Sequence, residues 1–351
     1  KVSYTMDGGE SDGAASYAFT MADEAGNTAT VTSAGSNVVI DNTAPTLSAV
    51  TIASNNTNDS YAKVGDVITL SITSTEDLTA APTVFIAGRA ATVNDVGGSA
   101  SDYTATITGN STDTQGAVAI SIAFTDLTGN AGTTVTATTN GSSVIYDRAV
   151  PTLAAVTVTS NNDNTAYAKQ GDIVTLSFTS SENVQASPTV TIDGNDATVS
   201  GSNSTWSAAY TMQSGDTEGD VNFTIDFVDI SGNSGTRVTS LTSGSKIVYD
   251  ETTPTLPTVD ISSNNSNGAT FAKVGDVITI AITGSENIQT PTVTIAGNAA
   301  TITSGSNGES VYEATYTMQS SDNTGVVAFT VDFSDMANND GTQVTAVAND
   351  S

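Results

Sequence analysis

The sequence predicts an all-β protein made of several small β-sandwich domains in tandem. Short segments such as Val67–Ile72 alternate apolar and polar residues, which is the pattern of a half-buried strand. These segments are rich in Val and Thr, which suit a pleated surface, and no stretch shows the 3.6-residue period of a helix. The same phrases also return at a fixed interval along the chain. Alternation, composition and repetition therefore favour a string of sandwiches.

The interval is the size of one domain. The phrase Pro-Thr-Leu begins at Pro45, Pro151 and Pro254, about 100 residues apart, which matches one immunoglobulin-like sandwich and is too long for a solenoid repeat. Each interval holds about seven short strand-like segments separated by turn residues. The predicted fold is therefore a tandem of immunoglobulin-like β-sandwich domains in an elongated array.

The repeat gives the domain boundaries in a chain of 351 residues. We expect the C-terminal part of one domain at residues 1–45, followed by whole domains at 46–151 and 152–254. A last domain that lacks its closing strand is expected at 255–351. These are called the leading segment and repeats 1, 2 and 3. The chain opens in mid-pattern at Lys1 with no signal peptide, so we expect a piece of a longer protein.

The balance of charge is strongly acidic and excludes several functions. Eight Lys and Arg stand against 37 Asp and Glu, for a formal net charge of -29. Nucleic-acid binding needs clustered basic residues, and an anionic membrane surface would repel this chain. Apolar runs of a few residues are too short to span a membrane. The partners that such a surface favours are cations.

The chain contains no Cys and no His. Disulfides, thiolate metal sites and the His-dependent catalytic arrangements are therefore excluded. A pair of carboxylates, as in a glycosidase, would need a cleft that small sandwiches in a string do not offer. We therefore expect a protein that is not an enzyme.

Shared phrases link the repeats to a known family. Repeats 1 and 2 have a Gly-Asp turn before a strand, a Ser-Glu-Asn or similar acidic phrase after it, then Pro-Thr-Val, Asp-x-x-Gly-Asn and a closing Tyr-Asp. Repeat 3 has the same order up to Asp335–Asn339, where Asn338 replaces Gly. This order resembles the bacterial immunoglobulin-like repeats of very large calcium-binding surface adhesins, with similar modules in surface-layer proteins. The resemblance implies an extracellular, cell-surface location and calcium ions that stiffen the array.

Within an immunoglobulin-like topology, three elements should meet where the chain enters each domain: the linker, the loop after the second strand and the loop before the last strand. Each carries a carboxylate, and Asn at the end of Asp-x-x-Gly-Asn adds a further oxygen. Oxygen ligands without His or Cys favour Ca²⁺. The candidate ligands are Asp41, Glu76, Asp126 and Asn130 for repeat 1, Asp147, Glu182, Asp229 and Asn233 for repeat 2, and Asp250, Glu286, Asp335 and Asn339 for repeat 3, where Asn338 replaces the loop Gly.

Simpler interpretations stand beside these. Asp-x-x-Gly-Asn also describes a tight turn in which Asp caps its own backbone. A second acidic loop, Ser214–Asp220, is either another ion site or a solvated turn. Lys63, Lys169 and Lys273 lie next to Gly-Asp turns, so we expect exposed lysines and not isopeptide bonds. The only Trp, Trp206, is expected in the core.

The leading hypothesis is a calcium-stiffened extender segment of an extracellular adhesin, with calcium ions and neighbouring repeats or copies of itself as partners. One alternative is a subunit of a surface layer or extracellular filament, which would assemble through lateral contacts. Another is a carbohydrate-binding module, although aromatic residues make up only 6% of the chain.

Overall fold

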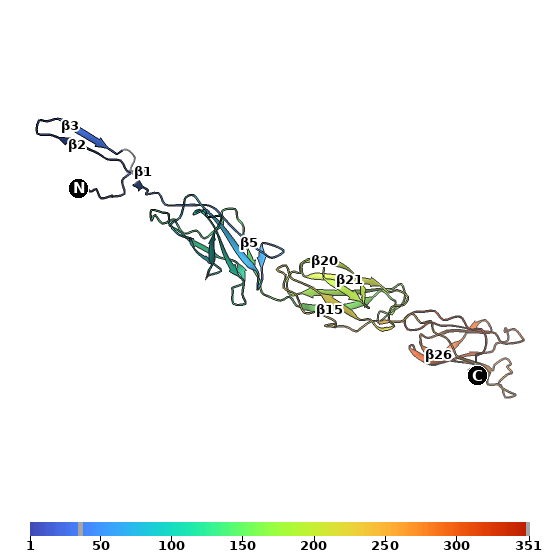
Figure 1. Cartoon of the computed structure of the whole chain (residues 1–351). Coiled ribbons are helices and arrows are strands. Elements are labelled where there is room, and N and C mark those ends of the chain that lie inside the picture. Colours follow the sequence, from blue (N-terminus) through green and yellow to red (C-terminus); the bar gives the residue numbers. More distant parts are fainter. Residues whose placement is uncertain (34–37, 349–351) are drawn as a thin grey trace. The chain divides into compact units, whose positions relative to one another are not determined.

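The computed structural model describes residues 1–33 and 38–348, and the predicted end of repeat 3 at residue 351 lies outside that part. All of its regular elements are β-strands (Figure 1). The part of the chain that the structure describes contains no helix that could span a lipid bilayer.

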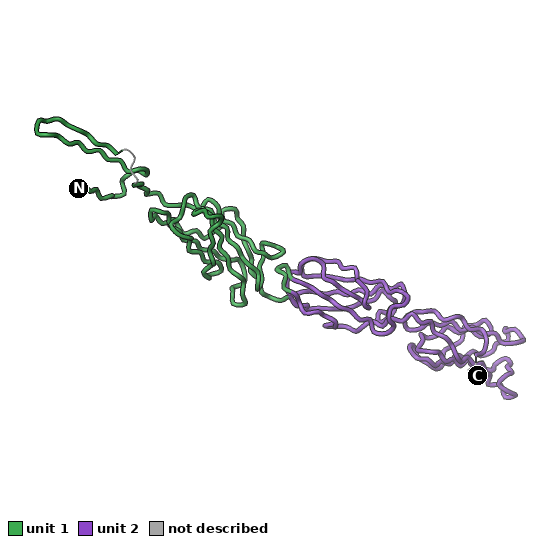
Figure 2. Tube along the Cα trace, in the orientation of Figure 1, with its two compact units in different colours: residues 1–150, 229–233 green, residues 151–228, 234–351 purple. Residues whose placement is uncertain are grey.

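Contacts along the chain divide it into two compact units (Figure 2). Unit 1 comprises residues 1–150 together with the loop 229–233, and unit 2 comprises residues 151–228 and 234–351. The three boundaries between the four predicted segments are not tested by this division and stay predictions.

The leading segment forms two small antiparallel pairs, β1 with β4 and β2 with β3. Apart from the half-buried Ile40, the residues of these strands are exposed. The strands are β1 (Gly13–Ala14), β2 (Ala18–Ala22), β3 (Thr28–Thr32) and β4 (Val39–Ile40).

Repeat 1 has a four-stranded sheet in the order β10-β11-β7-β5, a three-stranded sheet β13-β8-β9 and a small sheet β12-β14-β6. Its strands are β5 (Leu47–Ser54), β6 (Tyr61–Ala62), β7 (Val67–Ser74), β8 (Thr83–Ile86), β9 (Arg89–Ala90), β10 (Thr92–Asp95), β11 (Asp102–Thr108), β12 (Gly116–Ala117), β13 (Ile120–Ala123) and β14 (Ile145–Tyr146).

Repeat 2 follows the same plan, with sheets β15-β17-β21-β20, β19-β18-β23 and β16-β24-β22. Its strands are β15 (Leu153–Ser160), β16 (Tyr167–Ala168), β17 (Ile173–Ser180), β18 (Thr189–Ile192), β19 (Asn195–Asp196), β20 (Thr198–Ser202), β21 (Thr205–Thr211), β22 (Gly219–Asp220), β23 (Phe223–Asp226) and β24 (Val248–Tyr249).

Repeat 3 keeps the two large sheets, β25-β26-β30-β29 and β28-β27-β31. Among its described residues, no strands correspond to β6, β12 and β14. Its strands are β25 (Thr258–Ser263), β26 (Val277–Ile288), β27 (Thr292–Ile295), β28 (Asn298–Ala299), β29 (Thr301–Ser304), β30 (Glu309–Thr317) and β31 (Phe329–Asp332).

The core of each sandwich is formed by apolar residues that alternate with polar residues along the strands. In β7, Ile68, Leu70 and Ile72 are buried, and they join a cluster with Ile86 of β8 and Ile122 of β13, which lie in the opposite sheet. Since a strand places successive side chains on opposite faces, this period of two predicts the buried positions from the sequence. Repeats 2 and 3 have separate cores of the same kind. The all-β, immunoglobulin-like fold is therefore confirmed.

A buried tyrosine holds the closing strand in repeats 1 and 2. Strand β14 runs parallel to β6, and Tyr146 is 1% exposed with its hydroxyl donating to the Asn110 carbonyl at 2.6 Å. Tyr249 of β24 is fully buried and donates to the Gln213 carbonyl at 2.7 Å. Trp206 is also buried, as expected, in the core of repeat 2.

Candidate functional site

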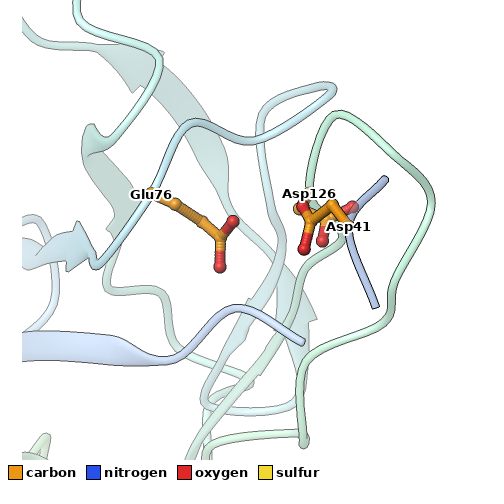
Figure 3. A group of neighbouring side chains, drawn as sticks. All are labelled: Asp41, Glu76 and Asp126. Atoms are coloured by element: carbon orange, nitrogen blue, oxygen red, sulfur yellow. The ribbon is translucent and has the colours of Figure 1, made fainter. Parts of the chain in front are cut away.

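Three carboxylates from distant parts of the sequence meet at one end of repeat 1. Asp41 follows β4, Glu76 follows β7 and Asp126 lies beyond β13. Each offers an oxygen within 4.8 Å of the others, and Figure 3 shows the Asp41 and Asp126 carboxylates next to each other with Glu76 directed toward them. This is the first carboxylate group.

Repeat 3 has an equivalent third carboxylate group within unit 2. Asp250 follows β24, Glu286 belongs to β26 and Asp335 lies beyond β31, and their oxygens again fall within 4.8 Å of one another. Glu286 was expected in a loop, and this detail is wrong because β26 continues to Ile288, which pairs with Glu309.

The residues predicted for the second group are divided between the units. Glu182 belongs to unit 2, whereas Asp147, Asp229 and Asn233 belong to unit 1. Within unit 1, Asn233 donates through Nδ2 to the Asp147 carbonyl at 3.2 Å. The second group as a set of ligands stays a prediction.

The Asp of each Asp-x-x-Gly-Asn loop organises its own backbone. Oδ1 of Asp126 accepts the amides of Thr128, Gly129 and Asn130 at 2.7–2.8 Å. Gly129 has a φ of 98°, in the left-handed region that favours glycine. The tight-turn interpretation is therefore confirmed for this loop. A turn of this kind also fixes a buried carboxylate, since Asp126 is only 1% exposed.

The loop asparagines donate hydrogen bonds within the site through their side-chain amide nitrogens. Asn130 Nδ2 donates to Oδ2 of Asp126 at 2.8 Å and to the Asp41 carbonyl at 3.1 Å. Asn339 Nδ2 makes the same two bonds, to Asp335 at 2.8 Å and to the Asp250 carbonyl at 2.9 Å. Each asparagine thus ties the entering linker to the loop, and direct ligation by Asn130, Asn233 and Asn339 stays a prediction.

The electrostatics of both groups show repulsion between carboxylates. Burial, followed by the charges of Asp250 and Asp335, raises the pKa of Glu286 to about 7. Burial, followed by the charge of Asp41, also raises the pKa of Glu76. Asp126 behaves differently: burial raises its pKa, but hydrogen bonds from Asn130 and Thr128 outweigh this and lower it to about 2. A bound cation would offset the repulsion between carboxylates that contributes to the raised pKa values of Glu76 and Glu286.

A fourth carboxylate lies near each group and was not among the predicted ligands. The charge of Asp12 acts on Glu76, and the charge of Glu218 acts on Glu286. The two acids occupy matching positions, just before Gly13 and Gly219, after the Tyr-Thr-Met phrases that begin at Tyr4 and Tyr210. Aligning the repeats on those phrases would have found them.

The rest of the second acidic loop is an ordinary capped turn. Asp216 accepts the Gln213 amide at 2.7 Å and bonds from Asn195 and Tyr210. Asp322 accepts the matching amide of Gln319 at 2.7 Å. These bonds show that the loop contains a capped turn, and the second ion site stays a prediction.

The donor set of the first and third groups fits a hard divalent cation. Two oxygens that bind one Ca²⁺ at about 2.4 Å are at most about 4.8 Å apart, and the carboxylate oxygens of each group lie within that limit of one another. The chain supplies no His or Cys, so zinc and copper sites are not favoured. Backbone carbonyls and water would complete a shell of about six to eight oxygens.

Comparisons with known proteins identify no family for the chain. No family model matches the chain, and no curated protein sequence matches it. Among solved structures, one from work on host cell surface retention by a 1.5-MDa bacterial ice-binding adhesin is 20% identical, with a TM-score of 0.47 over 87% of this chain and 97% of that chain.

Two further solved structures are less similar. A D1–D4 ectodomain fragment of ICAM-5 is 13% identical, with a TM-score of 0.31 over 85% of this chain and 75% of that chain. A Bacteroides ovatus protein, SGBP-B, bound to a mixed-linkage heptasaccharide is 15% identical, with a TM-score of 0.18 over 88% of this chain and 71% of that chain. Similarities at this level carry no argument about function.

Proposed function

We propose that this chain is a non-catalytic extender segment of an extracellular adhesin, in which calcium ions stiffen the junctions between repeats. The observation that carries the proposal is the convergence of linker, strand-end and loop carboxylates within 4.8 Å, in the same arrangement in repeats 1 and 3. A single functional pocket would not need the same arrangement in more than one repeat.

The mechanism follows from charge. Without metal, the charges of Asp41 and Asp126 repel Glu76, while Asn130 and Thr128 donate hydrogen bonds to Asp41 of the linker. A Ca²⁺ ion bound to all three carboxylates would attach the linker to two loops of the following repeat. Because the ion binds the folded form, it would also raise the free energy of unfolding.

Thermal unfolding with excess calcium and with chelator tests the proposal, with small-angle scattering on the same samples. We expect calcium to raise the melting temperature and to lengthen the particle. Glu76→Gln and Glu286→Gln together should reduce both effects, whereas Glu309→Gln, a change outside the carboxylate groups, should leave them intact. If calcium changes neither quantity in the unmodified chain, the proposal is wrong.

A further inference from the structure

A polar group lies at the opposite end of each sandwich from the carboxylates. In repeat 1 it consists of Asn56, Lys63 and Asp66, and we call it the clasp. Oδ2 of Asp66 accepts Asn56 Nδ2 at 2.7 Å and the Lys63 amide at 2.9 Å. The aspartate thus holds the Asn-rich turn and the Lys turn together. Repeat 2 has the same clasp at Asn162, Lys169 and Asp172.

The clasp in repeat 1 holds a loop of the Asp-x-x-Gly-Asn type. Asn56 Nδ2 donates to the Ser231 carbonyl at 2.8 Å, and Lys63 Nζ donates to the Gly232 carbonyl. These contacts lie within unit 1, to which the loop 229–233 belongs. The lysine is half-buried, so the expectation of an exposed Lys63 is wrong, because the loop covers it.

The clasp in repeat 2 makes the same contacts within unit 2. Asn162 Nδ2 donates to the Ala337 carbonyl at 2.8 Å, and Lys169 Nζ donates to the Asn338 carbonyl. Asn164 adds a bond to the Met336 carbonyl at 2.9 Å. Lys169 is half-buried and Asn162 only 5% exposed, so the expectation of exposure also fails at Lys169.

Both clasps bind the backbone of the loop at the same two positions. The third loop residue is Ser231 in one case and Ala337 in the other, and the fourth is Gly232 or Asn338, yet the carbonyls accept the same bonds. The fourth residue has a positive φ in both loops, 85° and 67°. Both clasps therefore bind the same two backbone carbonyls of the loop, and in repeat 2 Asn338 Nδ2 adds a side-chain bond to Oδ1 of Asn162 at 2.6 Å.

Repeat 3 has the same clasp without a loop. Asp276 accepts Asn265 Nδ2 at 2.5 Å and the Lys273 amide at 2.8 Å, so the turn geometry is already formed. Lys273 Nζ turns back onto Asp276 Oδ1 at 2.5 Å, and its side chain is 72% exposed. Among the described residues, no loop carbonyl takes the place that Gly232 and Asn338 occupy at the other two clasps.

The chain also carries loops of this type that no clasp holds within the described residues. The loops 23–27 and 126–130 each close with a bond from the Asp amide to the Asn carbonyl, at 2.9 and 3.1 Å, as the loops 229–233 and 335–339 do at 3.0 and 3.1 Å. Gly26 and Gly129 have φ values of 84° and 98°. Their fourth carbonyls are therefore held in the same local conformation as those that receive the lysines.

We propose that the clasp is a metal-independent receptor for the Asp-x-x-Gly-Asn loop of an adjoining immunoglobulin-like repeat, and that Asn265, Lys273 and Asp276 form an open copy of it. The partner of the open copy is another repeat of this kind. Tethering two repeats supplies the high effective concentration that a contact of a few hydrogen bonds requires. Calcium is not needed, so the contact can exist whether or not the carboxylate groups bind metal.

Hydrogen exchange of the full chain in chelator, read by mass spectrometry, tests the filled clasp. Lys169→Met removes one charged hydrogen bond and keeps the aliphatic stem, so amides of residues 335–341 should exchange about tenfold faster. Lys273→Met is the matched control and should leave these amides unchanged. Unaltered exchange in Lys169→Met, or an equal effect of both substitutions, would overturn the proposal.

The open clasp is tested in the full chain lengthened by a second copy of residues 246–351, which supplies a closing strand and one more loop. Met336→Leu in the added copy gives its loop peptide a distinct mass. In this chain Lys273→Met should speed exchange in the added loop about tenfold. If the added loop exchanges at the same rate with and without that substitution, the assignment of an open receptor is wrong. Both arms are run in chelator, so their outcome is separate from that of the calcium proposal.

Discussion

The loops 126–130 and 335–339 have the same internal hydrogen bonds but different surroundings. Both place a buried aspartate in a carboxylate group. The loop 126–130 is joined to the linker by Asn130 and Thr128. The loop 335–339 has the corresponding bond from Asn339 and is also held by the clasp of repeat 2. One loop therefore has two separable faces, a charged face toward the linker and a backbone face toward a clasp.

The difference also appears at the fourth position of the loop. Gly129 has no side chain, whereas Asn338 adopts a φ of 67°, which Asn tolerates better than most residues, and donates through Nδ2 to Oδ1 of Asn162 at 2.6 Å. The departure from Gly that the sequence shows at Asn338 thus adds a contact where a clasp is present.

The largest expected effect is on the stability of the loops. Asp335→Ala leaves the buried amides of Ala337 and Asn339 without their acceptor and should lower the free energy of unfolding of repeat 3 by about 2–4 kcal/mol. Asp126→Ala removes bonds to three amides and should cost repeat 1 at least as much. Chemical denaturation in chelator measures both. A loss of less than about 0.5 kcal/mol in both variants would contradict the capping role.

The next effect is a pH dependence that belongs to the third carboxylate group. Because the pKa of Glu286 rises from 4.5 to about 7 on folding, the folded protein holds a proton between these values that the unfolded protein lacks. The stability of repeat 3 in chelator should therefore fall as pH rises from about 4.5 to 7 and then level off. Glu286→Gln should flatten this part of the profile.

The same protonation should oppose calcium, because the ion requires the ionised carboxylate. Calcium affinity at the third group should weaken as pH falls below about 7. Isothermal titration across this range measures it. An affinity that is constant between about pH 5 and 8 would contradict the assignment of Glu286 as a ligand.

A smaller effect is expected when the loop asparagines that bond to the linkers are replaced. Asn130→Ala and Asn339→Ala each remove the bonds from one amide nitrogen, to an aspartate and to the linker carbonyl, and should cost about 1 kcal/mol. Of these two loops, the loop 335–339 is held by a clasp and the loop 126–130 has none among the described residues, so hydrogen exchange should rise more in loop 126–130 than in loop 335–339. Equal increases in the two loops would mean that the clasp does not restrain its loop.

The smallest effect is expected from Asn338→Gly. The substitution removes the bond to Asn162 but places glycine at a positive φ, so the two changes oppose each other. The free energy of unfolding of repeat 3 should change by less than about 1 kcal/mol. Thermal unfolding in chelator measures it, and a larger loss would show that the side chain of Asn338, and not only the loop backbone, is required.

The sequence predicts the sandwiches well because their cores depend on local alternation. Positions such as Ile68, Leu70 and Ile72 can be assigned from period two alone. The convergence of Asp41, Glu76 and Asp126 is predictable once the topology is assumed, since each follows a recognisable phrase. The contributions of Asp12 and Glu218 require an alignment of the repeats to one another.

The clasp is not predictable from the sequence in the same way. Lys63 and Lys169 look like exposed lysines in the sequence because each stands next to a Gly-Asp turn. Their acceptors are main-chain carbonyls 169 residues away along the chain. A backbone carbonyl is present at every residue, so it leaves no signal in the sequence, and only the folded chain shows which one the lysine meets.

Direct calcium titration by calorimetry, in the unmodified chain and in Glu76→Gln with Glu286→Gln, tests the central claim that the carboxylate groups are metal sites. The account predicts saturable binding that is lost from the first and third groups in the double variant, with Glu309→Gln retaining the heat of the unmodified chain. Absence of saturable binding in the unmodified chain, or binding that the double variant retains in full, would contradict it.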